Sequence, residues 1–101
     1  MRPRLIRKIR KEKRMKAVIT VIGKDMVGIL ASVSGTCAKE NANVMEVTQS
    51  VLQEFFAMVM VIDISKMSCE LCELQKQLEE SNPGMKIHVM HEDIFNSMHR
   101  I

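Results

Sequence analysis

Residues 55–64, FFAMVMVIDI, form the segment that most limits the folds open to this chain. Apolar side chains stand on both sides of this run, Val59 and Val61 on one side and Met58, Met60 and Ile62 on the other. Because side chains alternate along a strand, the run predicts a central strand in a sheet whose two faces are both covered. Its longest apolar part, residues 55–62, is far too short to cross a bilayer as a helix, so we expect no membrane partner.

The segments around this strand carry strand and helix patterns in turn. We expect strands at residues 17–22, 44–52, 55–64 and 86–92, and helices at residues 26–40, 68–81 and 93–101. Both longer helices have apolar side chains at helical spacing, Ile29, Val33 and Cys37 in one and Leu71, Leu74 and Leu78 in the other. Apolar and polar residues alternate along residues 44–52, which puts Met45, Val47 and Val51 on one side of the strand and Glu46, Thr48 and Ser50 on the side that faces solvent. Two turns interrupt the pattern, at residues 41–43 and at 82–84.

This order, βαββαβ with a short C-terminal helix, predicts an α+β fold of the ferredoxin-like type: a four-stranded antiparallel sheet with two helices on one face. Right-handed crossovers place the third strand between the first two and the fourth strand outside the first. Two helices cover only one face, whereas the central strands are apolar on both. We expect the C-terminal helix to hide part of the second face and a second copy of the chain to cover the rest, which predicts a homodimer.

Charge divides the chain at residue 14. Residues 1–14 carry eight Lys or Arg and one Glu, a net charge of +7, whereas residues 15–101 carry −4. We therefore expect a basic, disordered extension followed by one domain at 15–101, and no nucleic-acid binding by that domain. Three interpretations of the extension stay open: an upstream start codon chosen in place of Met15, a basic arm for acidic partners, or an amphipathic targeting helix. Three cysteines and no apolar signal segment lead us to expect a reducing cytoplasm.

The turn Gly23-x-Asp25-x-x-Gly28 joins the first strand to the first helix. Glycines allow a sharp turn and a close approach to the backbone, and free N–H groups at a helix start favour a carboxylate or a phosphate. A simple tight turn in which Asp25 caps the helix explains the same residues. The spacing is neither that of a dinucleotide fingerprint nor that of a phosphate-binding Walker loop.

Several features together give the chain its likeness to a known family. They are Gly23-x-Asp25-x-x-Gly28-Ile29, the Ala31-x-Val33-Ser34 helix, Ala42-Asn43-Val44, Thr48-Gln49, Phe56-x-Met58 and the ending Ile94-Phe95-Asn96-x-Met98. Over residues 15–101 the chain resembles ACT domains, in particular the small stand-alone ACT proteins of bacteria and archaea. It is also similar to the ACT segments of formyltetrahydrofolate deformylases and of the glycine-cleavage repressor.

The resemblance implies a regulatory module without catalytic activity or cofactor, whose partner is a small-molecule effector such as an amino acid. ACT ligands lie between domains, against the loop before the first helix of one domain and the start of the second strand of its neighbour. By position, these site residues are Asp25, Met26, Val27, Gly28, Ile29 and Leu30, with Asn43, Val44 and Met45 opposite. An assembly module that has kept the fold without a ligand is the alternative, in which Asp25 and Asn43 only cap or turn the chain.

Cys69-x-x-Cys72 at a predicted helix start admits a thiol redox function, because that position lowers thiol pKa values. A redox site of the thioredoxin type would need a parallel βαβ unit, which this element order does not provide. Zinc held by these cysteines with His88 and His91 is disfavoured, since positions three apart on a strand face opposite ways. We therefore expect no metal, and no serine has a sequence neighbour that would activate it as a nucleophile.

Overall fold

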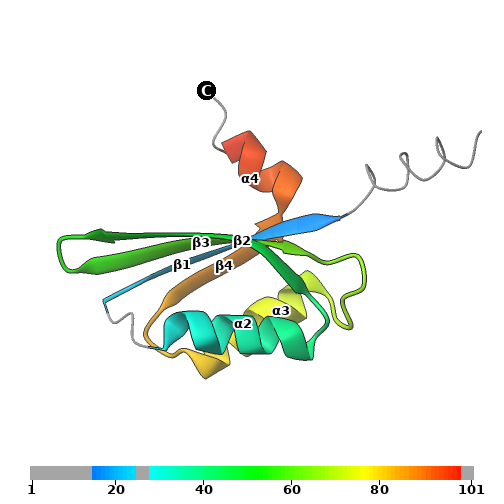
Figure 1. Ribbon diagram of the computed structural model, residues 1–101, viewed down its shortest axis with the longest axis horizontal. Coiled ribbons are helices and arrows are strands. Elements are labelled where there is room, and N and C mark those ends of the chain that lie inside the picture. The colour runs from blue at the N-terminus through cyan, green and yellow to red at the C-terminus, as the bar shows by residue number, and fades with distance from the viewer. Residues whose placement is uncertain (1–14, 25–27, 99–101) are drawn as a thin grey trace, which may run out of the picture.

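A computed structural model describes residues 15–24 and 28–98 of the chain. Its elements are β1 (Lys16–Gly23), α2 (Ile29–Lys39), β2 (Asn43–Leu52), β3 (Phe55–Asp63), α3 (Leu71–Ser81), β4 (Lys86–His91) and α4 (Glu92–Met98) (Figure 1). The predicted basic extension, residues 25–27 and the last three residues lie outside the described residues.

The sheet has the predicted ferredoxin-like topology. Its strand order is β2-β3-β1-β4, and each neighbouring pair is antiparallel. Figure 1 shows α2 and α3 against one face of the sheet and α4 against the other. The α+β βαββαβ fold expected from the sequence is thereby confirmed, with β3 and β1 as the central strands.

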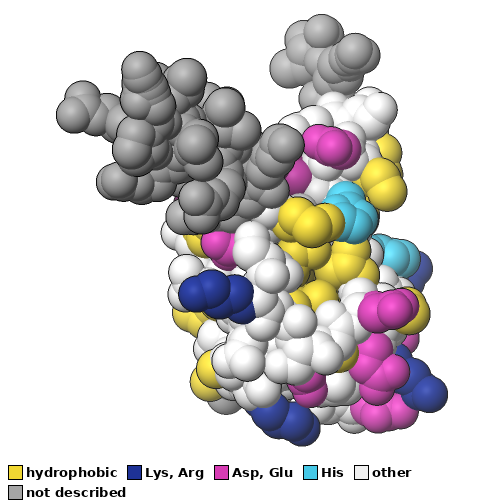
Figure 2. Space-filling model, turned by 90° about the vertical axis from the view of Figure 1, so that its right-hand side faces the viewer, with side chains coloured by type: hydrophobic (Ala, Val, Ile, Leu, Met, Phe, Trp, Pro, Cys, Tyr) yellow, Lys and Arg dark blue, Asp and Glu magenta, His cyan; other side chains and the backbone are white. Residues whose placement is uncertain are grey.

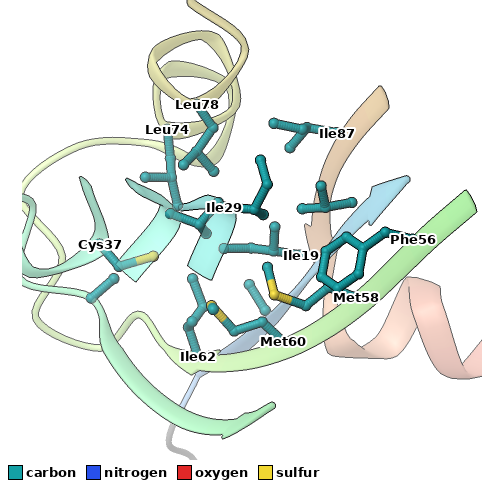
Figure 3. Packing of buried hydrophobic residues seen from close by; sticks show 14 residues of the cluster. Ile19, Ile29, Cys37, Phe56, Met58, Met60, Ile62, Leu74, Leu78 and Ile87 are labelled. Atoms are coloured by element: carbon teal, nitrogen blue, oxygen red, sulfur yellow. The ribbon is translucent and has the colours of Figure 1, made fainter. Parts of the chain in front are cut away.

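The core lies between the sheet and the pair α2 and α3. Figure 3 shows its side chains pointing toward one another from β1, β3, β4, α2 and α3: Ile19, Ile29, Cys37, Phe56, Met58, Met60, Ile62, Leu74, Leu78 and Ile87. Each fully buried aliphatic side chain of this kind stabilises the fold by about 1.5–3 kcal/mol. Met58, Met60 and Ile62, which share one face of β3, thus lie in the middle of the core, as the sequence pattern predicts.

Both long helices begin later than their sequence pattern predicts. Helix α2 starts at Ile29 rather than Met26, because its N-cap is Gly28 with φ 76°, a left-handed conformation that favours glycine. Helix α3 starts at Leu71 rather than Ser68. The Ser68 N–H donates to the backbone oxygen of Glu40 at 2.8 Å, which ties this residue to the end of α2.

Helix α2 ends in a Schellman motif, at the turn predicted for residues 41–43. Asn41 is left-handed with φ 64°, and the N–H of Ala42 donates to the Cys37 oxygen at 2.8 Å. The buried Ala42 then directs the chain into β2. The start of β2 is therefore fixed to the C-terminal end of α2.

The second face of the sheet is covered only in part. Val18, on this face of β1, is 2% exposed, and α4 packs on β1 and β4. Val59 and Val61 are half-buried, whereas Ile22 at the end of β1 is 49% exposed. The expectation that the C-terminal helix hides only part of this face is therefore correct.

Candidate functional site

The first half of the predicted site is the start of α2. The Gly28 backbone oxygen accepts the first helical hydrogen bond, from the Ser32 N–H at 2.9 Å, and Gly28, as the N-cap residue, makes no side-chain hydrogen bond to the helix. None of the residues in its first turn is acidic. The N–H groups of a helix start carry a partial positive charge, which attracts a carboxylate.

The side chains of this half divide between core and surface. Ile29 is 5% exposed and points into the core (Figure 3), so that a ligand can reach its backbone only. Leu30 is exposed, and the position of a Cβ on Gly28 has no neighbouring atom within 4 Å. Asp25, Met26 and Val27, which the sequence also assigns to this half, lie outside the described residues.

The second half of the predicted site is the start of β2. A groove of about 420 Å³ runs between this strand and α2, lined by Ser34, Ala38, Asn41, Ala42, Asn43 and Val44. Asn43 is exposed, and its amide can both donate and accept hydrogen bonds. Sequence reasoning missed Ser34 and Ala38, although their spacing of four residues already places them on one face of a helix.

Met45 lies in a β-bulge. The pairing of β2 with β3 shifts between Val44 and Glu46, so that Met45 is the extra residue, and its side chain is exposed. The sequence pattern predicts that Met45 lies on the same side of the strand as Val47 and Val51. This prediction is wrong for Met45, because the extra residue of the bulge interrupts the alternation of side chains. The bulge bends the edge strand next to the groove and presents Met45 to solvent.

The two halves do not meet within one chain. They lie at opposite ends of α2, whose 11 residues span about 16 Å at ~1.5 Å per residue. A ligand of amino-acid size cannot touch both ends. The structure therefore brings together Asn43, Val44 and Met45 at one end, and Gly28, Ile29 and Leu30 at the other.

The two edges of the sheet differ. Strand β2 is ten residues long and pairs only with β3 in the described part of the chain. Strand β4 has six residues, and the Gln75 side chain of α3 accepts a hydrogen bond from the Val89 N–H. Among the described strands, the edge that borders the groove is thus the longer one and the more open to another strand.

The Cys69-x-x-Cys72 pair lacks the properties of a reactive dithiol. Both thiols are free, and Cys72 is exposed at the start of α3. Burial, a hydrogen bond with Glu40 and the charges of Glu40 and Glu73 raise the pKa of Cys69 to about 11. Cys69 is therefore a protonated, poorly nucleophilic thiol at neutral pH, opposite to the lowered pKa that a helix start can give.

The zinc alternative has no matching geometry. Within residues 15–24 and 28–98, no three His, Cys, Asp or Glu side chains come close enough to hold a metal ion. Figure 2 shows the two described histidines beside hydrophobic side chains below α4.

None of the helices within residues 15–24 and 28–98 is long and apolar enough to cross a membrane.

Comparison with known proteins identifies an ACT domain, in agreement with the sequence resemblance. The family model for the ACT domain matches residues 16–91. The UPF0237 protein MJ1558 of Methanocaldococcus jannaschii is 41% identical over 88 residues, which are 85% of this chain and 98% of that protein. A UPF0237 protein of Clostridium perfringens is 44% identical over 89 residues, 86% of this chain and all of the relative.

Solved structures agree with this fold. An ACT domain protein from Streptococcus pneumoniae superposes with a TM-score of 0.70 at 36% identity, covering 82% of this chain and 96% of that one. A formyltetrahydrofolate deformylase from Pseudomonas syringae gives the same TM-score at 17% identity, over 87% of this chain but only 31% of the deformylase. The deformylase likeness is one of fold.

Proposed function

The chain belongs to the ACT domain family, and we propose that it is a homodimeric regulatory module that binds an amino acid between its two copies. ACT domains are generally regulatory modules that bind amino acids. One observation carries the proposal: the two halves of the predicted site lie at opposite ends of α2, beside the open edge of the sheet.

A two-fold axis perpendicular to the sheet, beside the middle of β2, would pair this strand with its copy in antiparallel fashion. The same rotation sets α2 antiparallel to its copy. The start of α2 in one chain then lies beside the start of β2 in the other, so that Gly28 approaches Asn43 of the second copy. Two identical sites result, each built from both chains.

The exposed surface of α2 suits this approach. Ala31, Gly35 and Ala38 on this surface are small and exposed, which permits a second helix to come close.

The chemistry of the proposed ligand follows from the two halves of the site, the start of α2 in one copy and the start of β2 in the other. The N–H groups at the start of α2 would hold a carboxylate, and Asn43 of the other copy would hydrogen-bond the rest of the ligand.

The proposed role is regulatory rather than catalytic. At the groove, the Ser34 hydroxyl donates to the backbone oxygen of Ala31 at 3.4 Å, so it is used in the helix rather than paired with a base. The Cys69 thiol, with its raised pKa, is a poor nucleophile. Both groups thus support binding without reaction.

The first test is a thermal-shift screen of the common amino acids, followed by calorimetry. A ligand at 100 times its dissociation constant should stabilise the protein by about 2.7 kcal/mol. Light scattering should give twice the mass of 11.6 kDa. A chain that stays monomeric, or that responds to none of the amino acids, contradicts the proposal.

A mixing experiment tests whether the site is shared. Gly28→Val damages one half of the site and Asn43→Leu the other, so each homodimer should bind nothing. In a heterodimer one of the two sites receives both intact halves, so a statistical mixture should regain about one quarter of the wild-type sites. Circular dichroism must show both variants folded, and a mixture that regains no binding rules out a site shared in this way.

One observation favours the alternative of an assembly module without a ligand. Ile94 and Met98 on α4 are more than half exposed and suit contact with another protein. Under this alternative Ile94→Ser would release a bound protein, and no amino acid would shift the melting temperature. The thermal-shift screen therefore separates the two functions.

A further inference from the structure

A second hollow lies away from the groove, at the end of the sheet where β1 stops and β4 starts. Its volume is about 640 Å³, within the range of about 300–1,000 Å³ that is typical of small-ligand pockets. Three segments far apart in the sequence form it: the end of β1 with Lys24, the start of β3 at Phe55, and residues 83–86, which lead into β4. No described residue of the predicted α2 and β2 site lines it.

The walls of this hollow are apolar and open to solvent. Ile22 is 49% exposed and Phe55 is 45% exposed, although both belong to the sheet. Pro83 and Met85 line the hollow beside them. Apolar surface that stays exposed within a concave site is a feature of ligand pockets.

Two lysines, Lys24 and Lys86, line the hollow. The Nζ of Lys24 lies 6.0 Å from the centroid of the Phe55 ring, over its face. Lys86 opens β4 directly opposite Ile22 in the register of the sheet. None of the described residues that line the hollow is acidic, so the cationic charge of the two lysines is not balanced within the lining.

We propose that this hollow binds a carboxylic acid that has an apolar, aromatic or branched body and no ammonium group. The apolar body would lie against Ile22 and Phe55, and the carboxylate would lie between Lys24 and Lys86. A free amino acid is disfavoured, because its ammonium would enter a site with two cations, whose described lining residues include no acidic side chain. The proposal does not depend on the amino-acid site at the α2 groove.

The test uses three probes that differ in one group each: 3-phenylpropanoate, L-phenylalanine and 3-phenylpropan-1-ol. Each is titrated into the full chain labelled with ¹⁵N, and amide shifts are followed by NMR. With 3-phenylpropanoate the shifts should gather at residues 22–24, 55 and 84–86. The alcohol, which lacks the charge, and L-phenylalanine, which adds an ammonium, should bind this hollow at least tenfold more weakly.

Two double variants then test the lysines. Lys24→Glu with Lys86→Glu should weaken 3-phenylpropanoate binding at least tenfold. Lys66→Glu with Lys76→Glu makes the same change of net charge at exposed lysines outside the hollow, and should leave the affinity within twofold. Dispersed NMR spectra confirm that each variant is folded.

The proposal is overturned if 3-phenylpropanoate causes no shifts at about 10 mM, well above the ~1 mM dissociation constant of a weak site. It is also overturned if the shifts gather elsewhere, if both double variants lose affinity equally, or if neither does. Shifts by L-phenylalanine at residues 28–30 and 43–45 would instead report the separate amino-acid site proposed between the two copies. Failure of one site is therefore distinguishable from failure of the other.

Discussion

The side-chain oxygen Oε1 of Gln75 accepts a hydrogen bond from the backbone N–H of Val89 at 2.9 Å. Gln75 belongs to α3 and Val89 to the edge strand β4, so the bond joins the two layers at the border of the sheet. A helix side chain thereby takes a backbone donor that an added strand would otherwise use.

Gln75→Ala should lower the free energy of unfolding by about 1 kcal/mol, because the partly buried Val89 N–H loses its acceptor. Hydrogen exchange of the Val89 amide should become faster. Glu79→Ala is the control: it removes only the acceptor of the exposed Gln75 Nε2 bond, and should cost no more than a few tenths of a kcal/mol. Equal losses in the two variants would contradict a stabilising role for the Val89 bond.

Three glycines should respond differently to alanine. A Cβ on Gly23 would overlap the Sδ of Met85, whose flexible end must then move aside, so Gly23→Ala should cost no more than about 1 kcal/mol through overpacking. Gly28 has free space but a φ of +76°, so Gly28→Ala should cost about 1–2 kcal/mol through backbone strain. Gly35 lies in α2 with neither constraint, and Gly35→Ala should stabilise the helix by about 0.5–1 kcal/mol.

The cause of the Gly23 effect can be isolated by urea unfolding of double variants. In a Met85→Ala background the cost of Gly23→Ala should fall by more than about 0.5 kcal/mol, because the overlapping sulfur is gone. The cost of Gly28→Ala should stay the same in that background. A Gly23→Ala cost that ignores Met85 would show that the close approach of the two residues is unimportant.

Thiol labelling should follow burial and charge. At pH 8 iodoacetamide should label the exposed Cys72 well before Cys69, whose pKa is raised to about 11. Glu40→Gln removes a hydrogen bond and a negative charge at Cys69, so its pKa should fall and its labelling should become faster. Glu80→Gln, a change at an exposed position, is the control, and peptide mass spectrometry measures labelling at Cys69 and Cys72.

The same raised thiol pKa values predict how stability depends on pH. Burial also raises the pKa of Cys37 to about 11 from a model-compound value of 9.0. The native state favours the protonated thiols, so their contribution to stability is complete below pH 9 and falls as the pH rises from 9 to 11. In Cys37→Ala the loss of stability over this interval, measured by urea unfolding, should be smaller than in the wild type. An unchanged slope would contradict this assignment.

Ala38→Arg should convert the proposed dimer into a monomer. Ala38 lines the α2 groove and is exposed, so a long charged side chain there leaves the core intact but prevents a second α2 from approaching. Glu80→Arg adds the same side chain on the exposed surface of α3 and should remain dimeric. Light scattering measures both, and a dimeric Ala38→Arg protein would exclude α2 from the interface.

Hydrophobic periodicity was enough to predict the order and topology of the elements. The two-sided residues 55–64 indicate a central strand, and the crossover rule gives the strand order. Element ends depend on contacts that periodicity does not contain. Asp25 suggested an earlier helix start, but the backbone conformation of Gly28 sets the first turn, and the Ser68 bond to Glu40 delays α3.

The candidate sites were predictable only where neighbouring residues form them. The motif Gly23-x-Asp25-x-x-Gly28 and the Asn43 turn are local, so a sequence resemblance could indicate both. The Met45 bulge arises from the register between β2 and β3, which no local pattern encodes. The hollow at Phe55 joins three separate segments and is visible only once the chain is folded.

The unequal edges of the sheet have a consequence for assembly size. Subunits that offer two free edges can add head to tail without limit and grow into fibres. Here β4 is short and carries the Gln75 bond, so that among the described strands β2 offers the longer edge for strand addition. In the proposed dimer, pairing of β2 with its own copy would use that edge on both molecules, and growth would end in a closed, self-complementary pair.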